Sequence, residues 1–547
     1  MKNLKLENNP TLYKNFLFIL TLLIPVFSFF HHRPLFKISS YEIDMRILFL
    51  IGIVGLLLVL FALNFYTLKF DLVAKIFTIF LVYMVLNSIF ISQSLIWSMP
   101  TFLRFLGMYF FYIFSMNLFK SQDDIEKLLK FILASGIFPA IVGIIQYIFK
   151  LGLNINDAHR IYGSFSTHPL GFAFFLQILI GICVYFYYKN GRTINIYLGY
   201  IGLLMFLLIQ TNTRLIFLTT VLLIFIIMII KKEYKKVLIS GTIGLLYLVF
   251  IQKSLIYRVL STLNMDSSTK FRYFVFKKME PFFYESPIFG EGLGNFAYIF
   301  EKLTGIERVA PHNDYFGILI ELGLIGLILY MLIQFIILIR AVFVFESDLV
   351  KITVLLYLNT NIIGFLSNPN NYFEIQIYVW VLLGAVRGYV INSRKEKKLN
   401  ICLAGSSGGH LTQLYQLKPW WEKHDRFWVT FDKEDSRSLL NVEQKYWCYH
   451  PTNRNIKNLI KNTFLAIKVL IKERPDIIIS TGAAPAIPFF YLGKLFGSKL
   501  IYVEVYDRID LPTLTGKIVY PITDKFILQW EEQKKHYPKG EVLGGVL

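Results

Sequence analysis

Long uncharged runs of apolar residues recur in this chain from Phe16 to Val390, each about 17 to 20 residues long. An α-helix rises ~1.5 Å per residue, so each run can cross ~30 Å of bilayer hydrocarbon. A soluble domain arranges its apolar residues in periodic stripes and has a lower hydrophobic fraction than the 55% found here. The runs therefore predict a polytopic α-helical membrane protein.

We expect about twelve spans within residues 1–392. The first is followed by His31-His32-Arg33-Pro34 instead of the small residues of a signal-peptide cleavage site. With the N-terminus in the cytosol, short inward loops carry about 21 Lys and Arg and short outward loops about 7, as the positive-inside rule requires. An even number of spans returns the C-terminus to the cytosol. The expected centres are Thr21, Gly55, Leu81, Tyr109, Ile137, Gln177, Gly202, Leu222, Leu245, Leu329, Tyr357 and Val381.

The net charge of +20 raises the question of nucleic-acid binding. Much of the excess lies in short loops between spans, such as Lys231–Lys236, where it sets topology and meets anionic lipid head groups. We therefore expect membrane lipids as partners and no nucleic acid. The three cysteines (Cys183, Cys402 and Cys448) lack metal-ligand spacing, so we expect reduced thiols and no metal site.

One outward segment is much longer than the others. It runs from about residue 252 to 311, and an outer loop of about 60 residues in a short-looped protein is usually functional. After the last span a basic linker, residues 393–398, separates the membrane part from a final segment of different character.

Residues 399–547 read as an α/β domain. Short apolar strands are expected at Leu399–Ala404, Arg426–Phe431, Asp476–Ser480, Leu500–Val505 and Lys525–Leu528, and a helix at Asn455–Ile471. Strands that alternate with helices indicate a parallel sheet of Rossmann type. At about 150 residues, this segment has the size of one half of a two-domain, GT-B-type nucleotide-sugar transferase.

Four short motifs follow one another in the membrane part. Together they resemble the O-antigen ligase/polymerase (Wzy-like) family, over roughly residues 70 to 390. The motifs are Arg160-Ile-Tyr-Gly163-Ser-Phe-Ser-Thr-His168-Pro169, Thr211-Asn-Thr213-Arg214, Ser268-Thr-Lys-Phe-Arg272 followed by Pro287-Ile-Phe-Gly290-Glu-Gly292-Leu-Gly294, and Pro311-His312-Asn313-Asp314-Tyr315 leading into Glu321-Leu-Gly323-Leu-Ile-Gly326.

The resemblance implies an enzyme that passes a glycan from a polyprenyl pyrophosphate to an acceptor hydroxyl at the outer face of a bacterial inner membrane. Such a donor is already activated, so no cofactor is expected. Arg160, Arg214 and Arg272 lie near the outer face in the expected topology, where arginines suit a developing pyrophosphate charge. His312 is the candidate base. For His168, a helix cap is the alternative to a catalytic role, and Arg104 is expected to be an interfacial residue.

Two glycine turns and one acidic segment mark the α/β domain. They are Gly405-Ser-Ser-Gly408-Gly409-His410, Ser480-Thr481-Gly482-Ala-Ala-Pro485 and Val503-Glu504-Val505-Tyr506-Asp507-Arg508. They resemble the acceptor-side, membrane-associating subunit of split UDP-GlcNAc transferases and its capsule-synthesis homologues, over essentially all of residues 399–547.

This second resemblance implies a subunit that holds a lipid-linked acceptor while a separate polypeptide binds the UDP-sugar. His410 would be a base toward the acceptor, and Gly408, Gly409, Gly482, Glu504 and Arg508 would bind it. Close strand–helix packing is the alternative for the first glycine turn, and an internal ion pair is the alternative for Glu504 with Arg508. Val505 stands where the family often has Ser, which weakens the case for chemistry there.

We therefore predict one chain that serves two steps of surface-polysaccharide synthesis, of the capsule, exopolysaccharide or O-antigen kind. Whether the outer step is polymerisation or ligation stays open. Two alternatives remain: a polymerase with a non-catalytic docking domain, and a transporter or flippase of lipid-linked sugars. Transporters place charges at the bilayer midplane, whereas the charges here gather toward one face.

Overall fold

The computed structural model describes residues 9–30, 34–38, 41–155, 158–165, 168–191, 196–235, 241, 267–307, 309–342, 347–393, 398–452 and 455–546. It divides into two compact units, Met1–Phe335 with Phe345–Asn392, and Ile336–Val344 with Ser393–Leu547. The linker residues 394–397, the first part of the long outer segment and the span expected near Leu245 lie outside the described residues.

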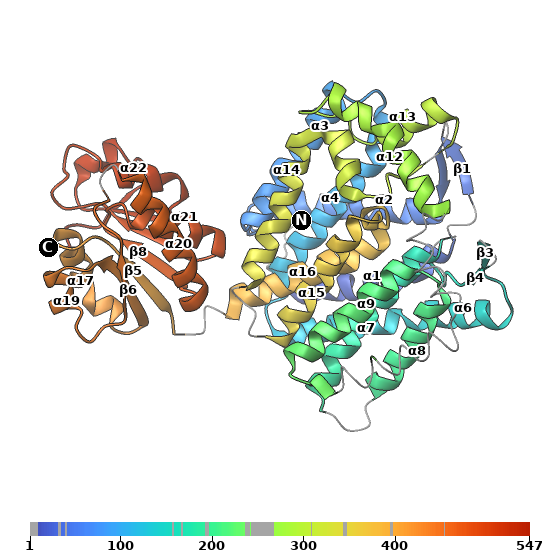
Figure 1. The fold of residues 1–547 in the computed structure, drawn as a ribbon, viewed down its shortest axis with the longest axis horizontal. Coiled ribbons are helices and arrows are strands. Elements are labelled where there is room, and N and C mark those ends of the chain that lie inside the picture. Colours follow the sequence, from blue (N-terminus) through green and yellow to red (C-terminus); the bar gives the residue numbers. More distant parts are fainter. Residues whose placement is uncertain are drawn as a thin grey trace. The chain divides into compact units, whose positions relative to one another are not determined.

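The first unit is a bundle of helices with two short hairpins (Figure 1). The hairpins pair β1 (Pro34–Ile38) with β2 (Tyr41–Asp44), and β3 (Leu153–Ile155) with β4 (Ala158–Arg160). Its helical elements are α1 (Pro10–Phe29), α2 (Met45–Asn64), α3 (Leu72–Phe90), α4 (Leu95–Leu118), α5 (Gln122–Ser135), α6 (Ile137–Ile148), α7 (Pro169–Lys189), α8 (Ile196–Gln210), α9 (Arg214–Ile230), α12 (Ser267–Glu285), α13 (Asn295–Thr304), α14 (Asp314–Val342), α15 (Asp348–Gly364), η3 (Pro369–Asn371) and α16 (Phe373–Ser393).

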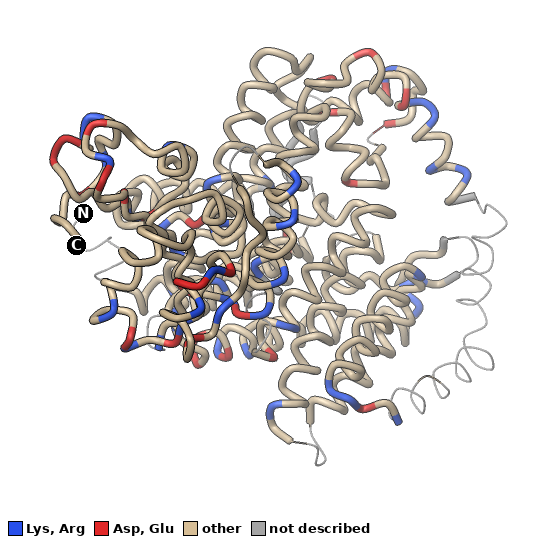
Figure 2. Tube along the Cα trace, turned by 60° about the vertical axis from the view of Figure 1, so that its left-hand side comes forward, with Lys and Arg blue, Asp and Glu red and all other residues tan. Residues whose placement is uncertain are grey.

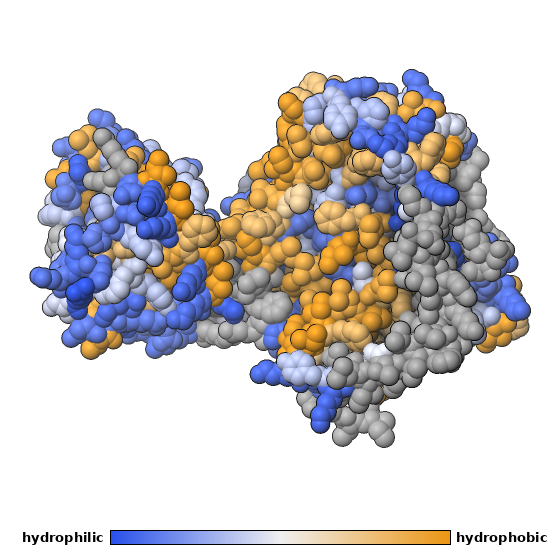
Figure 3. Space-filling view, viewed as in Figure 1, coloured by the Kyte–Doolittle hydropathy of each residue, from blue (hydrophilic) through white to orange (hydrophobic). Residues whose placement is uncertain are grey.

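Six described helical segments are long and apolar enough to cross a bilayer: Pro10–Phe29, Leu72–Phe90, Gln122–Ile148, Pro169–Lys189, Asp314–Arg340 and Phe373–Ser393. Figure 3 shows an apolar surface across the helices of this unit, with hydrophilic residues gathered toward its two ends. Figure 2 shows its charged residues mainly near the helix ends. The unit is therefore a multi-pass membrane bundle, and the full number of twelve spans stays a prediction.

Helix α14 is broken at Gly323, whose φ of 63° and ψ of −166° are not helical. Backbone groups next to the break, which would otherwise pair inside the helix, form hydrogen bonds with another segment. The carbonyls of Ile320 and Glu321 accept from the amides of Glu291 (2.8 Å) and Gly292 (2.9 Å). The amides of Leu324 and Ile325 donate to the carbonyls of Pro287 (2.9 Å) and Ile288 (3.3 Å).

The glycine turn at residues 287–294 thus fills the break. A backbone group in a bilayer must find a partner inside the protein, and this turn supplies four. Asn87 of α3 holds the turn from the other side, because its side chain donates to the Phe289 carbonyl (2.8 Å) and accepts from the Leu293 amide (2.8 Å). The third and fourth sequence motifs therefore meet as one structural joint.

The described part of the long segment that the sequence analysis expects at the outer face is mostly helical, because α12 and α13 occupy much of it. The two helices share a small core in which Val275, Met279, Phe296 and Phe300 are each at most 1% exposed. The sequence did not predict these helices.

The second unit contains a seven-stranded parallel sheet in the order β11-β10-β9-β8-β5-β6-β7. The chain starts in the middle of the sheet at β5, builds outward to β7, and then returns to β8 beside β5. This is the doubly wound order of a Rossmann sheet, in which ligands bind where the strand order reverses. The strands are β5 (Asn400–Ala404), β6 (Asp425–Phe431), β7 (Lys445–Cys448), β8 (Ile477–Ser480), β9 (Lys499–Val503), β10 (Lys525–Leu528) and β11 (Glu541–Val542).

Helices cover both faces of this sheet, and alternate side chains of each strand point to opposite cores. On β5, Cys402 and Ala404 enter one core, and Ile401 and Leu403 enter the other. The helical elements are α17 (Gly409–Gln416), α18 (Lys418–Trp421), α19 (Glu434–Leu439), α20 (Ile456–Glu473), α21 (Ala486–Phe496), α22 (Leu514–Val519), η4 (Tyr520–Ile522) and η5 (Glu531–Lys535). The predicted strands and the predicted helix at Asn455–Ile471 are present within two residues at each end.

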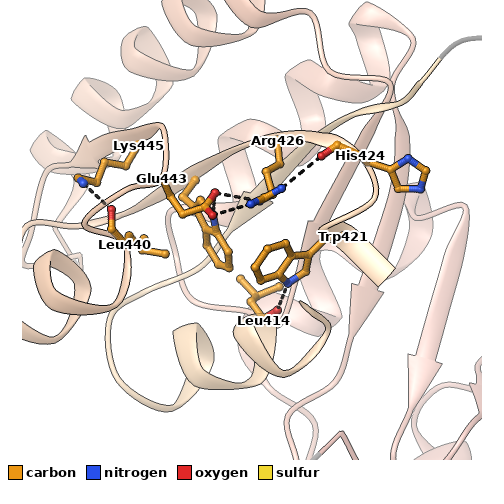
Figure 4. Close-up of polar contacts among 8 residues, drawn as sticks. Leu414, Trp421, His424, Arg426, Leu440, Glu443 and Lys445 are labelled. Atoms are coloured by element: carbon orange, nitrogen blue, oxygen red, sulfur yellow. Dashed lines mark hydrogen bonds and ion pairs between the residues drawn. The ribbon is translucent and has the colours of Figure 1, made fainter. Parts of the chain in front are cut away.

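One core is closed at its rim by a charged cluster (Figure 4). Arg426 donates two hydrogen bonds to the Glu443 carboxylate, at 2.8 and 2.6 Å, and its guanidinium lies 4.5 Å from the ring centroid of Trp421. Trp421 itself is 1% exposed and donates to the Leu414 carbonyl. These contacts stabilise the turn before β7, so this cluster has a structural role. All three cysteines are free and buried.

Candidate functional site

Helix ends and loops of the first unit bring the first two sequence motifs together. The Ile161 amide donates to the carbonyl of Gln210, the last residue of α8, at 3.3 Å. Gln146 braces the same loop, because its side-chain oxygen accepts from the amides of Tyr162 and Gly163. The loop that begins with Arg160 therefore lies beside the turn that leads to Arg214. Arg160 is 5% exposed, whereas Arg214 is half-buried and is the first residue of α9.

His168 caps helix α7, which is the alternative to a catalytic role given for this residue in the sequence analysis. Its Nδ1 accepts a hydrogen bond from the Leu170 amide at 3.3 Å. The first turns of α7 also contact the α15–α16 connection, where the rings of Phe174 and Tyr372 have centroids 5.6 Å apart. This packing places the start of α7, with its cap His168, beside the α15–α16 connection.

Arg272 of α12 and His312, just before α14, lie close together. Burial and the positive charge of Arg272 lower the pKa of His312 to about 4, and His168 contributes in the same direction. His312 adopts a left-handed backbone with φ of 57°, and its ring is 6.0 Å from that of Phe271. An imidazole with a depressed pKa is neutral at neutral pH and able to accept a proton.

A cluster of asparagines between α15 and α16 joins this group, and the sequence analysis missed it. Arg272 Nη1 donates to the Leu366 carbonyl at 2.9 Å, and Arg104 Nη1 donates to Asn371 Oδ1 at 2.6 Å. Arg104, expected to be an interfacial residue, is thus tied to the same turn as Arg272. The run Ser367-Asn-Pro-Asn-Asn371 between two apolar segments was the available signal.

This end of the bundle therefore collects guanidinium groups around a neutral imidazole. Guanidiniums bind phosphate oxygens in a fork-shaped geometry, and the imidazole accepts a proton from a hydroxyl. The structure brings Arg272, His312 and His168 together, and it places Arg160 beside the turn before Arg214.

In the second unit, His410 lies where the strand order reverses, between the loops after β5 and β8. Its Nδ1 is 2.9 Å from the Thr481 carbonyl, and the Thr481 hydroxyl donates to the His410 carbonyl at 2.8 Å. Burial lowers the pKa of His410, against the opposite influence of Thr481, Asp507 and Glu504. The two glycine turns thus meet through this histidine.

The three predicted binding glycines have different surroundings. Gly408 and Gly409 are exposed, and a methyl group on either would have no atom within 4 Å, so strand–helix packing does not require them. The Gly408 amide donates to Asp435 at 2.6 Å. A methyl group on Gly482 would lie 2.8 Å from His410 Cε1, and its φ is 126°. Gly482 therefore makes room for His410.

Glu504 is fully buried at the end of β9 and organises the loop that follows. Its carboxylate accepts from the Thr513 hydroxyl (2.9 Å) and from the Val505 amide (3.0 Å). The Arg508 side chain is exposed, and its carbonyl accepts from Gln533 at 2.8 Å. The structure therefore places Glu504 beneath the 505–513 loop and Arg508 on its surface.

Comparison with known families matches two segments of the chain. The O-Antigen ligase family matches residues 198–331, which include Arg214, Arg272 and His312. The family described as oligosaccharide biosynthesis protein Alg14 like matches residues 401–546, which include every predicted site residue of the second unit. Both resemblances predicted from the motifs are confirmed.

Among curated proteins, the similar relatives are UDP-N-acetylglucosamine transferase subunits ALG14. The human protein is 24% identical over 200 residues, covering 31% of this chain and 90% of the relative. That of Debaryomyces hansenii is 28% identical over 240 residues, covering 37% and 98%. That of Candida albicans is 28% identical over 179 residues, covering 28% and 81%. This chain thus joins an O-antigen-ligase-type membrane segment to an Alg14-like segment, and it is a glycosyltransferase-type enzyme.

Proposed function

We propose that this protein assembles a surface polysaccharide at a bacterial inner membrane. The membrane unit transfers a glycan from a polyprenyl pyrophosphate to an acceptor hydroxyl at the outer face. The Alg14-like unit acts at the cytosolic face, where it holds a lipid-linked acceptor and a partner subunit binds the UDP-sugar. Both termini are cytosolic in this arrangement.

The observation that carries the proposal is the position of Arg272 at one end of the bundle, next to Phe271, whose ring lies 6.0 Å from that of His312. Burial and Arg272 depress the pKa of His312, so its imidazole is neutral and has a free lone pair, and we assign it the role of accepting the proton of the acceptor hydroxyl. The acceptor oxygen then bonds to the anomeric carbon as the bond from that carbon to the pyrophosphate oxygen breaks. The arginines stabilise the charge that develops on the departing polyprenyl pyrophosphate.

For the second unit, the supporting observation is the position of His410 at the reversal of strand order, between the two glycine turns. The Gly408 and Gly409 positions are open on their outer side, as a site for an acceptor requires. The proposed role of the partner rests on the ALG14 relatives, which are named as subunits of a transferase.

The test is the glycan phenotype of Arg272→Ala in a strain whose own copy is deleted, with membrane insertion confirmed. The matched control is Lys277→Ala, because Lys277 lies on the same helix and forms an exposed pair with Glu280. We expect Arg272→Ala to accumulate lipid-linked glycan at the outer leaflet, as single repeat units without long chains if the step is polymerisation and as long lipid-linked chains if it is ligation, while the control stays normal. Normal chains would contradict the proposed outer site, and units trapped at the inner leaflet would favour the transporter reading.

A further inference from the structure

The connection between α15 and α16 is a compact turn, Leu366–Asn371, which we call the asparagine turn. The Asn371 amide donates to the Asn368 carbonyl at 3.1 Å, and the Tyr372 amide donates to the Pro369 carbonyl at 3.1 Å. Pro369 restricts the backbone at the centre of the turn. The turn therefore has a defined shape on which other groups can be positioned.

Two arginines from distant parts of the chain bind opposite ends of this turn. Arg272 donates to the carbonyl of its first residue, Leu366, and Arg104 donates to the side chain of its last residue, Asn371. The position of each guanidinium thus depends on the turn.

Asp314 holds the same turn from the inside. It is 7% exposed, and its carboxylate accepts from the Asn370 amide (3.1 Å) and from the Asn368 side-chain amide (3.4 Å). Asn370 in addition donates to the Tyr330 hydroxyl at 2.9 Å. Asp314 is the first residue of α14, so the start of this helix holds its side chain against the turn.

We infer that Asp314 is a positioning residue of the outer site: through the asparagine turn it sets the places of Arg272 and Arg104, which bind the pyrophosphate of the donor. The inference rests on the proposed function. An acidic side chain open to the substrate would repel a pyrophosphate, but this carboxylate is buried and bonded to the turn. Asp314 therefore acts on the substrate through the two arginines.

The test removes both acceptor oxygens of the carboxylate. Asp314→Ala leaves the Asn370 amide and the Asn368 side chain without this partner. Asp314→Asn is the intermediate variant, because an asparagine side chain keeps one acceptor oxygen. The matched control is Asp348→Ala, which removes a carboxylate at the start of α15 that pairs with Lys231.

The probe is inorganic pyrophosphate, added to the purified full-length protein in detergent, with affinity read from the thermal shift. We expect Asp314→Ala to weaken pyrophosphate binding and to raise KM for the lipid-linked donor, each about tenfold, with a smaller change in kcat. Asp314→Asn should show smaller losses of both, and Asp348→Ala should match the wild type. If Asp314→Ala fails to fold, Asn368→Ala retains the carboxylate and should weaken binding severalfold.

Equal pyrophosphate binding by the wild type and Asp314→Ala would overturn the inference. A loss in Asp314→Ala with normal binding by Asn368→Ala would also overturn it, since it would mean that the carboxylate acts directly from position 314. If instead the wild type shows no stabilisation by pyrophosphate, the proposed outer site itself fails, and the two failures are thereby distinguished.

Discussion

His410 and Thr481 hydrogen-bond to each other twice. The imidazole Nδ1 lies 2.9 Å from the Thr481 carbonyl, and the Thr481 hydroxyl donates to the His410 carbonyl at 2.8 Å. A carbonyl only accepts, so Nδ1 carries the hydrogen when the ring is neutral. The lone pair is then on Nε2, the nitrogen that a base needs.

Thr481→Val tests this arrangement because it removes one of the two bonds and keeps the shape. We expect a stability loss of about 1 kcal/mol and a larger fall in sugar transfer, measured with the partner subunit present. Thr463→Val is the control, since the Thr463 hydroxyl bonds only within α20, to the Leu459 carbonyl. Equal activity of the two variants would contradict the role of Thr481 in orienting His410.

Gly482→Ala should disrupt the same site by a different route. The new methyl group would press on the His410 ring, and a φ of 126° is unfavourable for alanine. We expect a loss of about 1–3 kcal/mol in unfolding free energy and loss of transfer. Gly409→Ala points into open space and should keep the fold. If Gly409→Ala nevertheless lowers acceptor affinity, the acceptor lies at this turn.

The titration of His312 gives a test that does not depend on activity. Its folded-state pKa of about 4 lies below the usual 6.5, so the imidazole stays neutral until the pH falls to about 4. Arg272→Gln removes a positive charge and should shift the midpoint upward, toward 6.5. NMR of labelled histidine, with His312→Asn to assign the signal, measures both. Asparagine tolerates the left-handed backbone that His312 adopts, so this variant should keep the loop. A wild-type midpoint near 6.5 would contradict the described burial.

Gly323→Ala should weaken the joint between α14 and the glycine turn. Gly323 has a positive φ, and an added methyl group would meet the Ile288 carbonyl. We expect a loss of at least about 2 kcal/mol and faster proteolysis within α12 and α13. Gly55→Ala in α2 is the control, because nothing lies within 4 Å of its added methyl group. Identical proteolysis of both variants would show that the joint does not hold these helices.

Helix α20 has an exposed face that suits a membrane surface. Ile456, Ile460 and Phe464 are 73%, 52% and 69% exposed, next to Lys457 and Lys461. Apolar side chains flanked by lysines bind anionic bilayers. We expect Phe464→Glu to lower transfer to a lipid-linked acceptor in membranes severalfold without changing stability by more than about 0.5 kcal/mol. Val442→Glu, at an 89% exposed position, is the control and should have no effect.

Five of the seven strands of the second unit were predicted, because each is a short apolar run that ends at a polar or glycine turn, as Leu399–Ala404 does before Gly405. Strands β7 and β11 were missed: β7 (Lys445–Cys448) is not followed by a glycine turn, and β11 contains only Glu541 and Val542, too few for a pattern. The sequence did not predict that the pKa values of His312 and His410 are lowered, because burial depends on the folded surroundings.

The site of the first unit was predictable in its residue types more than in its connections. Arg272 and His312 were chosen from motifs and expected topology, and they do lie together. Arg104 was interpreted as interfacial because its partner, Asn371, is 267 positions away in the chain. Local periodicity carries no information on such a contact.

The joint at Gly323 consists largely of main-chain hydrogen bonds, and this affects how far the sequences of α12 and α13 can vary. Four of its hydrogen bonds join backbone amides to backbone carbonyls, so they do not depend on which side chains α12 and α13 display. The side chains of those helices other than Arg272 can therefore vary while the attachment to α14 is retained. Swapping the segment between related proteins, with its glycine turn and Arg272 intact, is expected to keep this joint.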